Sequence, residues 1–145
     1  MIRFLFPGGK SLSVGADFFA VMALWWAVSG AGYFSAVSML AAVAAHELGH
    51  LAALFLTHIP VRETVLDLRG ITIRPKEGLY PEGKELFFVL AGPVTSLLLA
   101  GIFFLLKVPF VWTGGQLAAA VYSLFPFPGT DGWETGQILC RYFDK

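Results

Sequence analysis

Three ionisable side chains lie inside a run of more than twenty mostly apolar residues, about Phe34 to Leu56. Residues 46–50 of this run read His-Glu-Leu-Gly-His, and the flanking residues 34–45 and 51–56 carry no charge. A run of this length predicts a helix that crosses a membrane, where each central acid or base costs roughly 2.5 to 3.5 kcal/mol. Side chains that are kept at such a cost usually belong to a site.

The composition is typical of a membrane protein. Of the 145 residues, 57% are hydrophobic and 14% are charged, and the mean hydropathy is +0.71. A soluble domain is about half apolar and a quarter charged. The formal net charge is zero, which argues against nucleic acid as a partner. We expect no cleavable signal peptide, because residues 1–14 contain Arg3 and Lys10 and no apolar segment that precedes a cleavage site.

Apolar segments long enough to cross a bilayer predict about four transmembrane helices. They cover about residues 18–34, 34–56, 85–106 and 111–140, and the last is interrupted by Phe-Pro-Phe-Pro-Gly-Thr-Asp-Gly at residues 125–132. The expected fold is therefore an all-α polytopic membrane protein, with a single membrane-embedded domain over residues 1–145. We expect its tryptophans to lie at the membrane interface or to face lipid: Trp25, Trp26, Trp112 and Trp133.

The distribution of Lys and Arg predicts the orientation. Four spans place both termini and the loop between the second and third spans on one side, and nine of the ten Lys and Arg lie there. The positive-inside rule makes that side cytoplasmic. His46 and His50 precede the cytoplasmic end of their helix by about 8 to 12 residues, which is roughly 12 to 18 Å of depth.

The cytoplasmic loop between the second and third spans predicts a short β-hairpin. Val65 to Leu68 and Ile71 to Ile73 alternate β-forming and polar residues on either side of a turn at Arg69 and Gly70. Glycine at that position allows the turn geometry that a tight hairpin needs. An irregular amphipathic loop at the lipid headgroups is the alternative.

The spacing of the buried motif indicates a metal site. His46 and His50 stand at i and i+4 and so share one helix face, the arrangement that binds zinc, with Glu47 beside them as a candidate base. A catalytic zinc commonly has three protein ligands, so a third must come from elsewhere. Asp131 follows the Pro-rich break, where irregular backbone at membrane depth must be buried in protein or line a cavity. Asp131 can also cap the helix that follows, and the residues alone leave both readings open.

Three motifs, in this order along the chain, resemble those of the site-2 proteases, a family of intramembrane zinc metalloproteases, and in particular their compact sporulation-type branch. His46-Glu47-Leu48-Gly49-His50 is similar to the zinc-binding helix motif. Ala91-Gly92-Pro93, which we expect to open the third span, is similar to the Ala-Gly-Pro signature. Pro126 followed by Asp131-Gly132 resembles the Asn-x-x-Pro…Asp-Gly element, in which the Asp is the third ligand. The resemblance covers about residues 43–138.

The resemblance implies one zinc ion held by His46, His50 and Asp131, with Glu47 as the catalytic base. The implied reaction is hydrolysis of a peptide bond within or beside a transmembrane segment of a membrane protein substrate, near the cytoplasmic face. The implied location is the bacterial cell membrane, as a multi-pass protein with both termini cytoplasmic. The lipid bilayer and a regulatory membrane protein are the further partners expected, and no PDZ or CBS domain is expected.

The chain departs from the family pattern at two positions. Ser123 and Ser96 stand where the family commonly has Asn, and the Asn that corresponds to Ser123 helps to seat substrate near the metal. Both serines are therefore candidate substrate-binding residues, although a hydroxyl has a shorter reach and fewer hydrogen bonds than a carboxamide.

Two other functions compete with proteolysis. One is a non-catalytic site-2-protease-like membrane protein that binds partners, which the two serines favour and the complete His-Glu-x-x-His motif disfavours. The other is a metal transporter that uses the His pair, which would need a continuous polar path through spans that carry few polar residues.

Overall fold

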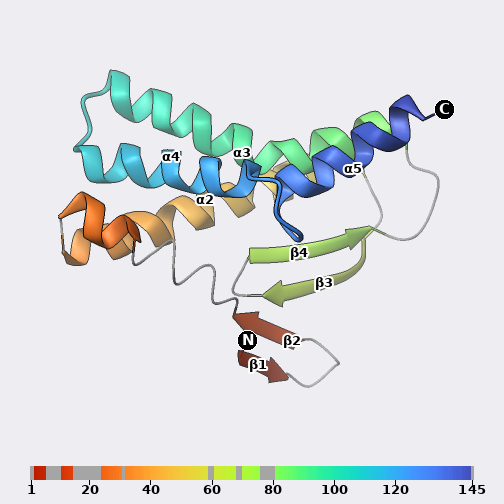
Figure 1. Ribbon diagram of the computed structural model, residues 1–145, viewed down its shortest axis with the longest axis horizontal. Coiled ribbons are helices and arrows are strands. Elements are labelled where there is room, and N and C mark those ends of the chain that lie inside the picture. Colours follow the sequence, from red (N-terminus) through yellow and green to blue (C-terminus); the bar gives the residue numbers. More distant parts are fainter. Residues whose placement is uncertain are drawn as a thin grey trace.

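The computed structural model describes residues 2–5, 11–14, 24–30, 32–58, 61–67, 70–75 and 81–144, with side chains for 24–30, 32–58, 81 and 83–144. The helices are α2 (Tyr33–Thr57), α3 (Glu82–Leu105), α4 (Phe110–Leu124) and α5 (Asp131–Phe143), and residues 24–29 are also helical. α2, α3 and α4 each contact the other two, and α5 packs mainly against α3 and α4 (Figure 1).

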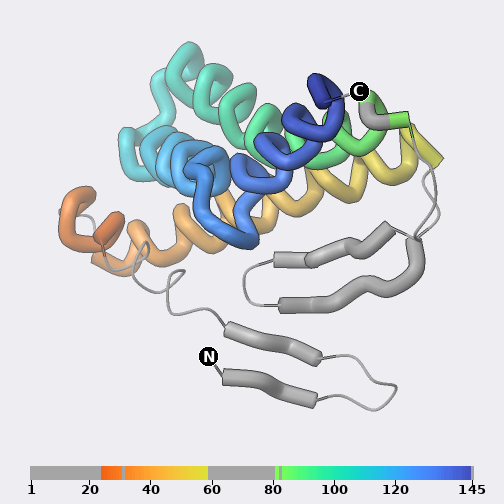
Figure 2. Tube along the Cα trace, turned by 45° about the vertical axis from the view of Figure 1, so that its right-hand side comes forward, coloured from red at the N-terminus to blue at the C-terminus, as the bar shows by residue number. Residues whose placement is uncertain are grey.

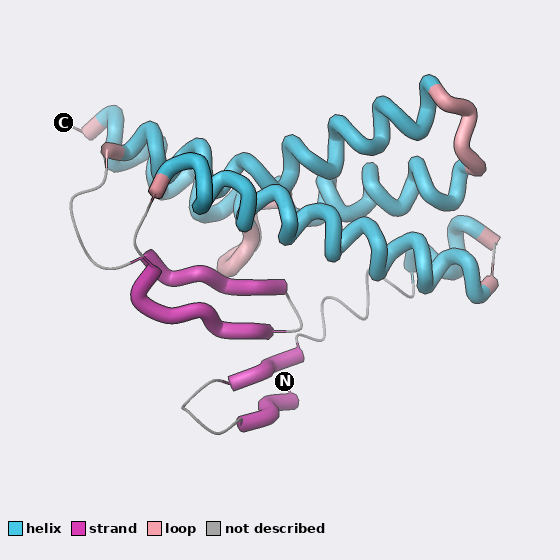
Figure 3. Tube along the Cα trace, turned by 180° about the vertical axis from the view of Figure 1, so that it is seen from behind, coloured by secondary structure: helices cyan, strands magenta, loops and turns pink. Residues whose placement is uncertain are grey.

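In the part of the chain that the structure describes, four strands form two antiparallel hairpins (Figure 3). β3 (Val61–Asp67) pairs with β4 (Gly70–Pro75), with Val65 opposite Thr72, in the segment where the sequence predicts a hairpin. The predicted turn residue Arg69 lies outside the described residues. β1 (Ile2–Leu5) pairs with β2 (Ser11–Val14), a second hairpin that the sequence pattern does not predict.

Two of the described helices are long and apolar enough to cross a membrane, Tyr33–Thr57 and Gly83–Leu105. They correspond to the predicted second and third spans. Many large apolar side chains on them point outward, and Phe55 and Phe104 are 79% and 75% exposed. Soluble monomers rarely expose large contiguous apolar patches, so lipid is a natural environment for this surface.

The predicted count of four spans is not supported. In the predicted first span, the described residues are helical over 24–29, and α2 already begins at Tyr33. The predicted fourth span consists of two helices, α4 of 15 residues and α5 of 13, each shorter than the 17 to 25 residues that a transmembrane helix requires. Within the described residues the structure therefore supports two membrane-spanning helices, and the predicted first span is described only from residue 24 onward.

The break between α4 and α5 has a local cause. Phe125 precedes Pro126, whose ring disfavours helical backbone in the residue before it, and Phe125 is extended at φ −68° and ψ 136°. α4 therefore ends at Leu124. The chain then turns through Gly129, which has a positive φ of 89°, before α5 begins at Asp131. In Figures 1 and 2, α4 lies beside one half of the α2–α3 pair and α5 beside the other.

The core beside α4 is centred on Trp25, which is 8% exposed and packs with Met39, Ala42 and Ala119. Its Nε1–H donates to Ser38 Oγ at 3.1 Å, and Gly114 leaves room for the ring, because a Cβ there would lie 2.2 Å from it. The expectation that Trp25 lies at the interface or faces lipid is therefore wrong. Trp26, by contrast, is 54% exposed.

Candidate metal centre

α2 presents His46 and His50 on one buried face. The helix is rich in Ala and Leu, which favour helical backbone, and residues at i and i+4 lie one above the other on it. The two histidines are 7% and 6% exposed, whereas Leu48, between them in sequence, is 62% exposed. Spacing and amphipathicity thus place both imidazoles toward the other helices.

Asp131 is the first residue of α5, and Thr130 caps that helix. The Thr130 side chain accepts a hydrogen bond from the Trp133 backbone N–H, so the cap that the sequence analysis considered for Asp131 belongs to its neighbour. The Asp131 carboxylate is therefore available for other contacts. It also lies at the positive end of the α5 dipole, which stabilises a negative charge.

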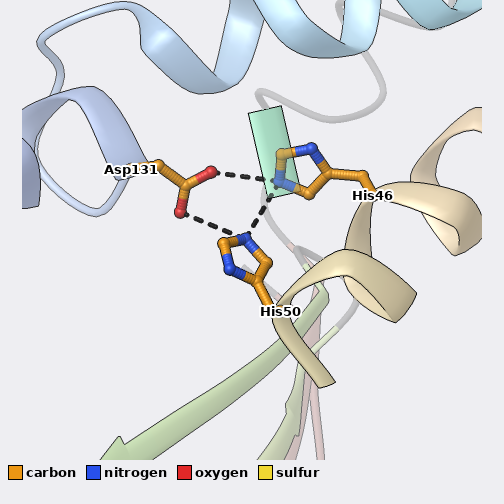
Figure 4. A group of neighbouring side chains, drawn as sticks. All are labelled: His46, His50 and Asp131. Carbon is orange, nitrogen blue, oxygen red and sulfur yellow. Dashed lines mark hydrogen bonds and ion pairs between the residues drawn. The ribbon is translucent and has the colours of Figure 1, made fainter. Parts of the chain in front are cut away.

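The three side chains converge on one point (Figure 4). Asp131 Oδ2 lies 3.0 Å from His46 Nε2, Asp131 Oδ1 lies 3.5 Å from His50 Nε2, and the two Nε2 atoms are 3.2 Å apart. Two atoms bound to one zinc at about 2.0 to 2.1 Å in tetrahedral geometry lie roughly 3.3 to 3.4 Å apart. The separation of the two Nε2 atoms is close to that value, and each Nε2 lies near one oxygen of the Asp131 carboxylate, so the three side chains could hold one metal ion.

Hydrogen bonds on the far side of the imidazoles bear on their protonation. His50 Nδ1 lies 2.9 Å from the Phe88 carbonyl oxygen, which can only accept, so His50 donates from Nδ1, and in the neutral ring Nε2 then presents a lone pair. His46 Nδ1 lies 3.3 Å from Ser96 Oγ. A histidine that binds a metal commonly donates its other N–H in this way, which fixes the ring for coordination.

The backbone of α3 lies directly against the histidine pair at Gly92. A Cβ built there would lie 2.2 Å from His50 Nε2 and 2.6 Å from His46 Nε2, so only glycine allows the rings to approach this closely. Farther along the same contact between α2 and α3, a Cβ on Gly49 would lie 2.4 Å from Thr95 Oγ1.

The position of the Ala-Gly-Pro motif differs from the prediction. We expected residues 91–93 to open the third span, but Pro93 lies in the interior of α3, well after its start at Glu82. Proline has no N–H to donate to the carbonyl four residues earlier, which weakens the helix at this point. The motif therefore belongs to the middle of the helix, where it faces the histidines, and does not mark a helix start.

The other predicted site residues are placed as follows. Glu47 lies on α2 and is half-buried. Ser96 is fully buried on α3 behind His46, at 0% exposure. Ser123 is buried on α4, and its hydroxyl donates to the Ala120 carbonyl of its own helix at 3.1 Å. The substrate-binding roles of the two serines stay predictions.

The sequence does not predict three contributors to the site: the Phe88 carbonyl, the steric role of Gly92 and the Thr130 cap. The cap had a readable signal, since Thr directly before a helix start is a favoured N-cap. The Phe88 carbonyl had none, because a backbone oxygen is present at every position and only the packing of α3 against α2 selects this one.

The fold and the cluster together define a class: a mainly helical protein with two helices of membrane-spanning length and a group of two His and one Asp that could hold a metal ion. A scan against protein-family models and a search of curated proteins find no match. Among solved structures, the chain is similar to the Site-2 Protease from Methanocaldococcus jannaschii, with a TM-score of 0.64 and 17% identity over 96% of this chain and 71% of that chain. At this identity the likeness shows a shared fold, which supports the resemblance to the site-2 proteases.

Proposed function

We propose that this chain is an intramembrane zinc metalloprotease of the site-2 protease kind. The single observation that carries the proposal is the convergence of His46, His50 and Asp131, whose ligand atoms all lie within 4.8 Å of one another. Two of these residues belong to a His-Glu-x-x-His motif, which supplies Glu47 one position after the first ligand. The shared fold with a Site-2 Protease supports the same reading.

His46, His50 and Asp131 would hold the ion. Zinc bound there would supply Lewis acidity, which activates a water and polarises the scissile carbonyl. Glu47 would take the proton from the attacking water and return it to the leaving amine, the task of a general base that then acts as an acid. Burial of the histidines at 7% and 6% exposure would keep bulk water away from this chemistry and strengthen its electrostatics.

The substrate we propose is a membrane protein cut within or beside a transmembrane segment, near the cytoplasmic face. The surface of α2 and α3 supports a membrane location, and His46 lies near the middle of α2. A helical substrate hides its carbonyls in hydrogen bonds, so it must unwind locally before it is cut. The same proposal includes an orientation with both termini in the cytoplasm and a location in the bacterial cell membrane. It also includes a regulatory membrane protein as a partner and membership of the sporulation-type branch.

The experiment that tests this function compares Glu47→Gln with the starting protein. The variant keeps all three ligands, so it should retain zinc while cleavage falls by about 10²- to 10⁴-fold, the typical contribution of a general base. Zinc content of the purified protein is measured first. Comparative membrane proteomics then identifies proteins that accumulate uncut, and cleavage of one of them is followed with purified components, before and after zinc removal by a chelator.

Glu85→Gln is the matched control, because it makes the same chemical change in a surface ion pair with Arg141 at 2.9 Å. Such a pair is worth about 0.2 to 1 kcal/mol, so this variant should cleave normally. Unchanged turnover by Glu47→Gln would refute the role of Glu47. A starting protein that binds no zinc would refute the proposed function as a whole.

A further inference from the structure

Ser96 lies on the opposite side of the His46 ring from the ligand cluster. His46 Nε2 faces Asp131 and His50, whereas Nδ1 points away from them (Figure 4) and lies 3.3 Å from Ser96 Oγ. The imidazole therefore separates the serine from the ion site. A substrate bound at the metal would meet the ring before it met Ser96, which is 0% exposed.

The two histidines are held by different kinds of group. The partner of His50 Nδ1 is the Phe88 carbonyl, a backbone acceptor that stays in place when side chains change. The partner of His46 Nδ1 is a side-chain hydroxyl, which can either accept or donate. If the hydroxyl donates, the proton of His46 is on Nε2, where it faces the Asp131 carboxylate at 3.0 Å and must leave before this nitrogen binds a metal. If it accepts, the proton is on Nδ1 and Nε2 presents its lone pair.

We propose that Ser96 is a positioning residue whose hydroxyl accepts the Nδ1–H of His46 and so holds Nε2 as a metal ligand. The inference rests on the proposed metal centre and gives Ser96 a role other than the substrate contact that the sequence indicates. His46 is the ligand whose orientation depends on a side chain, and Ser96 determines which of its nitrogens is free. Partners of this kind typically change metal affinity by 10- to 100-fold.

The test measures zinc affinity of the detergent-solubilised full chain by competition with a chromophoric chelator. Ser96→Ala should weaken zinc binding by about tenfold, at the low end of that range because 3.3 Å is a long hydrogen bond. Ser96→Thr restores the hydroxyl and should recover most of the affinity. Ser96→Cys keeps a side chain of the same shape, somewhat larger and with a much weaker acceptor, so it should resemble Ser96→Ala and serves where alanine impairs folding.

Ser38→Ala is the matched control. Ser38 is 1% exposed and lies on α2 eight residues before His46, about 12 Å along the helix. The substitution therefore removes a serine hydroxyl that is equally buried but distant from the proposed ligands. Its zinc affinity should stay within twofold of the starting protein. The melting temperature of each zinc-free variant is measured alongside, to separate loss of the ligand geometry from general loosening of the bundle.

The outcomes separate this inference from the proposed function. Equal zinc affinity of Ser96→Ala and the starting protein overturns the positioning role, while the metal centre stands. Weak binding by both Ser96→Ala and Ser96→Thr, with unchanged melting temperatures, also overturns it, because packing and not the hydroxyl then matters. If the starting protein itself binds no zinc, the metal centre fails and this inference fails with it.

Discussion

Replacing Gly92 by alanine tests how closely the histidine pair rests on α3. A Cβ at this position would lie 2.2 Å from His50 Nε2 and 2.6 Å from His46 Nε2, where an ordinary contact is about 3.5 Å. The new methyl group therefore overlaps both ligand atoms by about 1 Å. It cannot avoid them by rotation, because a Cβ has no torsion of its own. The rings must move instead.

The size of the effect follows from this overlap. Overpacking of a well-packed interior costs about 1 to 3 kcal/mol. In the zinc-free protein the two imidazoles can turn aside, and alanine recovers about 1 kcal/mol of helix propensity over glycine. In the zinc-bound protein the rings are needed where the methyl lies. We therefore expect zinc affinity to fall about 5- to 150-fold, which is 1 to 3 kcal/mol, with little change in the zinc-free melting temperature.

Gly101→Ala is the control for this substitution. Gly101 lies on the same helix, and a Cβ there has no atom within 4 Å, so this change alters helix propensity without a collision. Both variants are compared with the starting protein by chelator competition and by thermal unfolding in detergent. If Gly92→Ala binds zinc as tightly as Gly101→Ala, the histidines do not bind the metal in the positions described, and the reasoning is refuted.

Two further predictions concern the ligand from α5 and the core. Asp131→Asn should weaken zinc binding by more than about 100-fold, because a charged ligand is replaced by a neutral amide. This is more than the loss of a hydrogen-bond partner of a ligand typically costs. Full zinc occupancy of the purified variant would contradict the assignment of Asp131 as a ligand. Trp25→Ala should leave a cavity beside Met39 and Ser38 that costs up to about 3 to 5 kcal/mol, seen as a lower melting temperature with unchanged zinc affinity. Trp26→Ala removes the same side chain from an exposed position and should change the melting temperature little; equal effects of the two would contradict the burial of Trp25.

Local periodicity accounts for what the sequence predicts well. The predicted spans 34–56 and 85–106 fall close to α2 (Tyr33–Thr57) and α3 (Glu82–Leu105), because a long apolar run limits the backbone to a helix. The shared face of His46 and His50 follows from the helical repeat alone. The break before Asp131 follows from the local effects of Pro126 and Gly129.

The sequence predicts poorly those features that depend on which helix faces pack against one another in the folded protein. Hydropathy gives Trp25 and Trp26 the same character, yet one is buried beside Gly114 and the other is exposed, because only one faces α4. Pro93 was expected at a helix start, since that is its common place in helices, and its position inside α3 follows from residues far along the helix on both sides. Asp131 was also a candidate cap for the helix that follows, but Thr130, one residue earlier, caps α5.

The ligand cluster depends on close backbone approaches as much as on its donors. Gly92 lets both imidazoles rest on α3, and Gly132 lets the start of α5 lie against the end of α4, where a Cβ would be 2.0 Å from the Leu124 carbonyl oxygen. The second approach positions Asp131, the adjacent residue. Because metal–ligand distances must be met to about 0.2 Å, a shift of an ångström at either glycine separates the donors even when His46, His50 and Asp131 are all present. The His-Glu-x-x-His motif alone would therefore not be sufficient for the proposed metal site, which would also need glycine at positions 92 and 132.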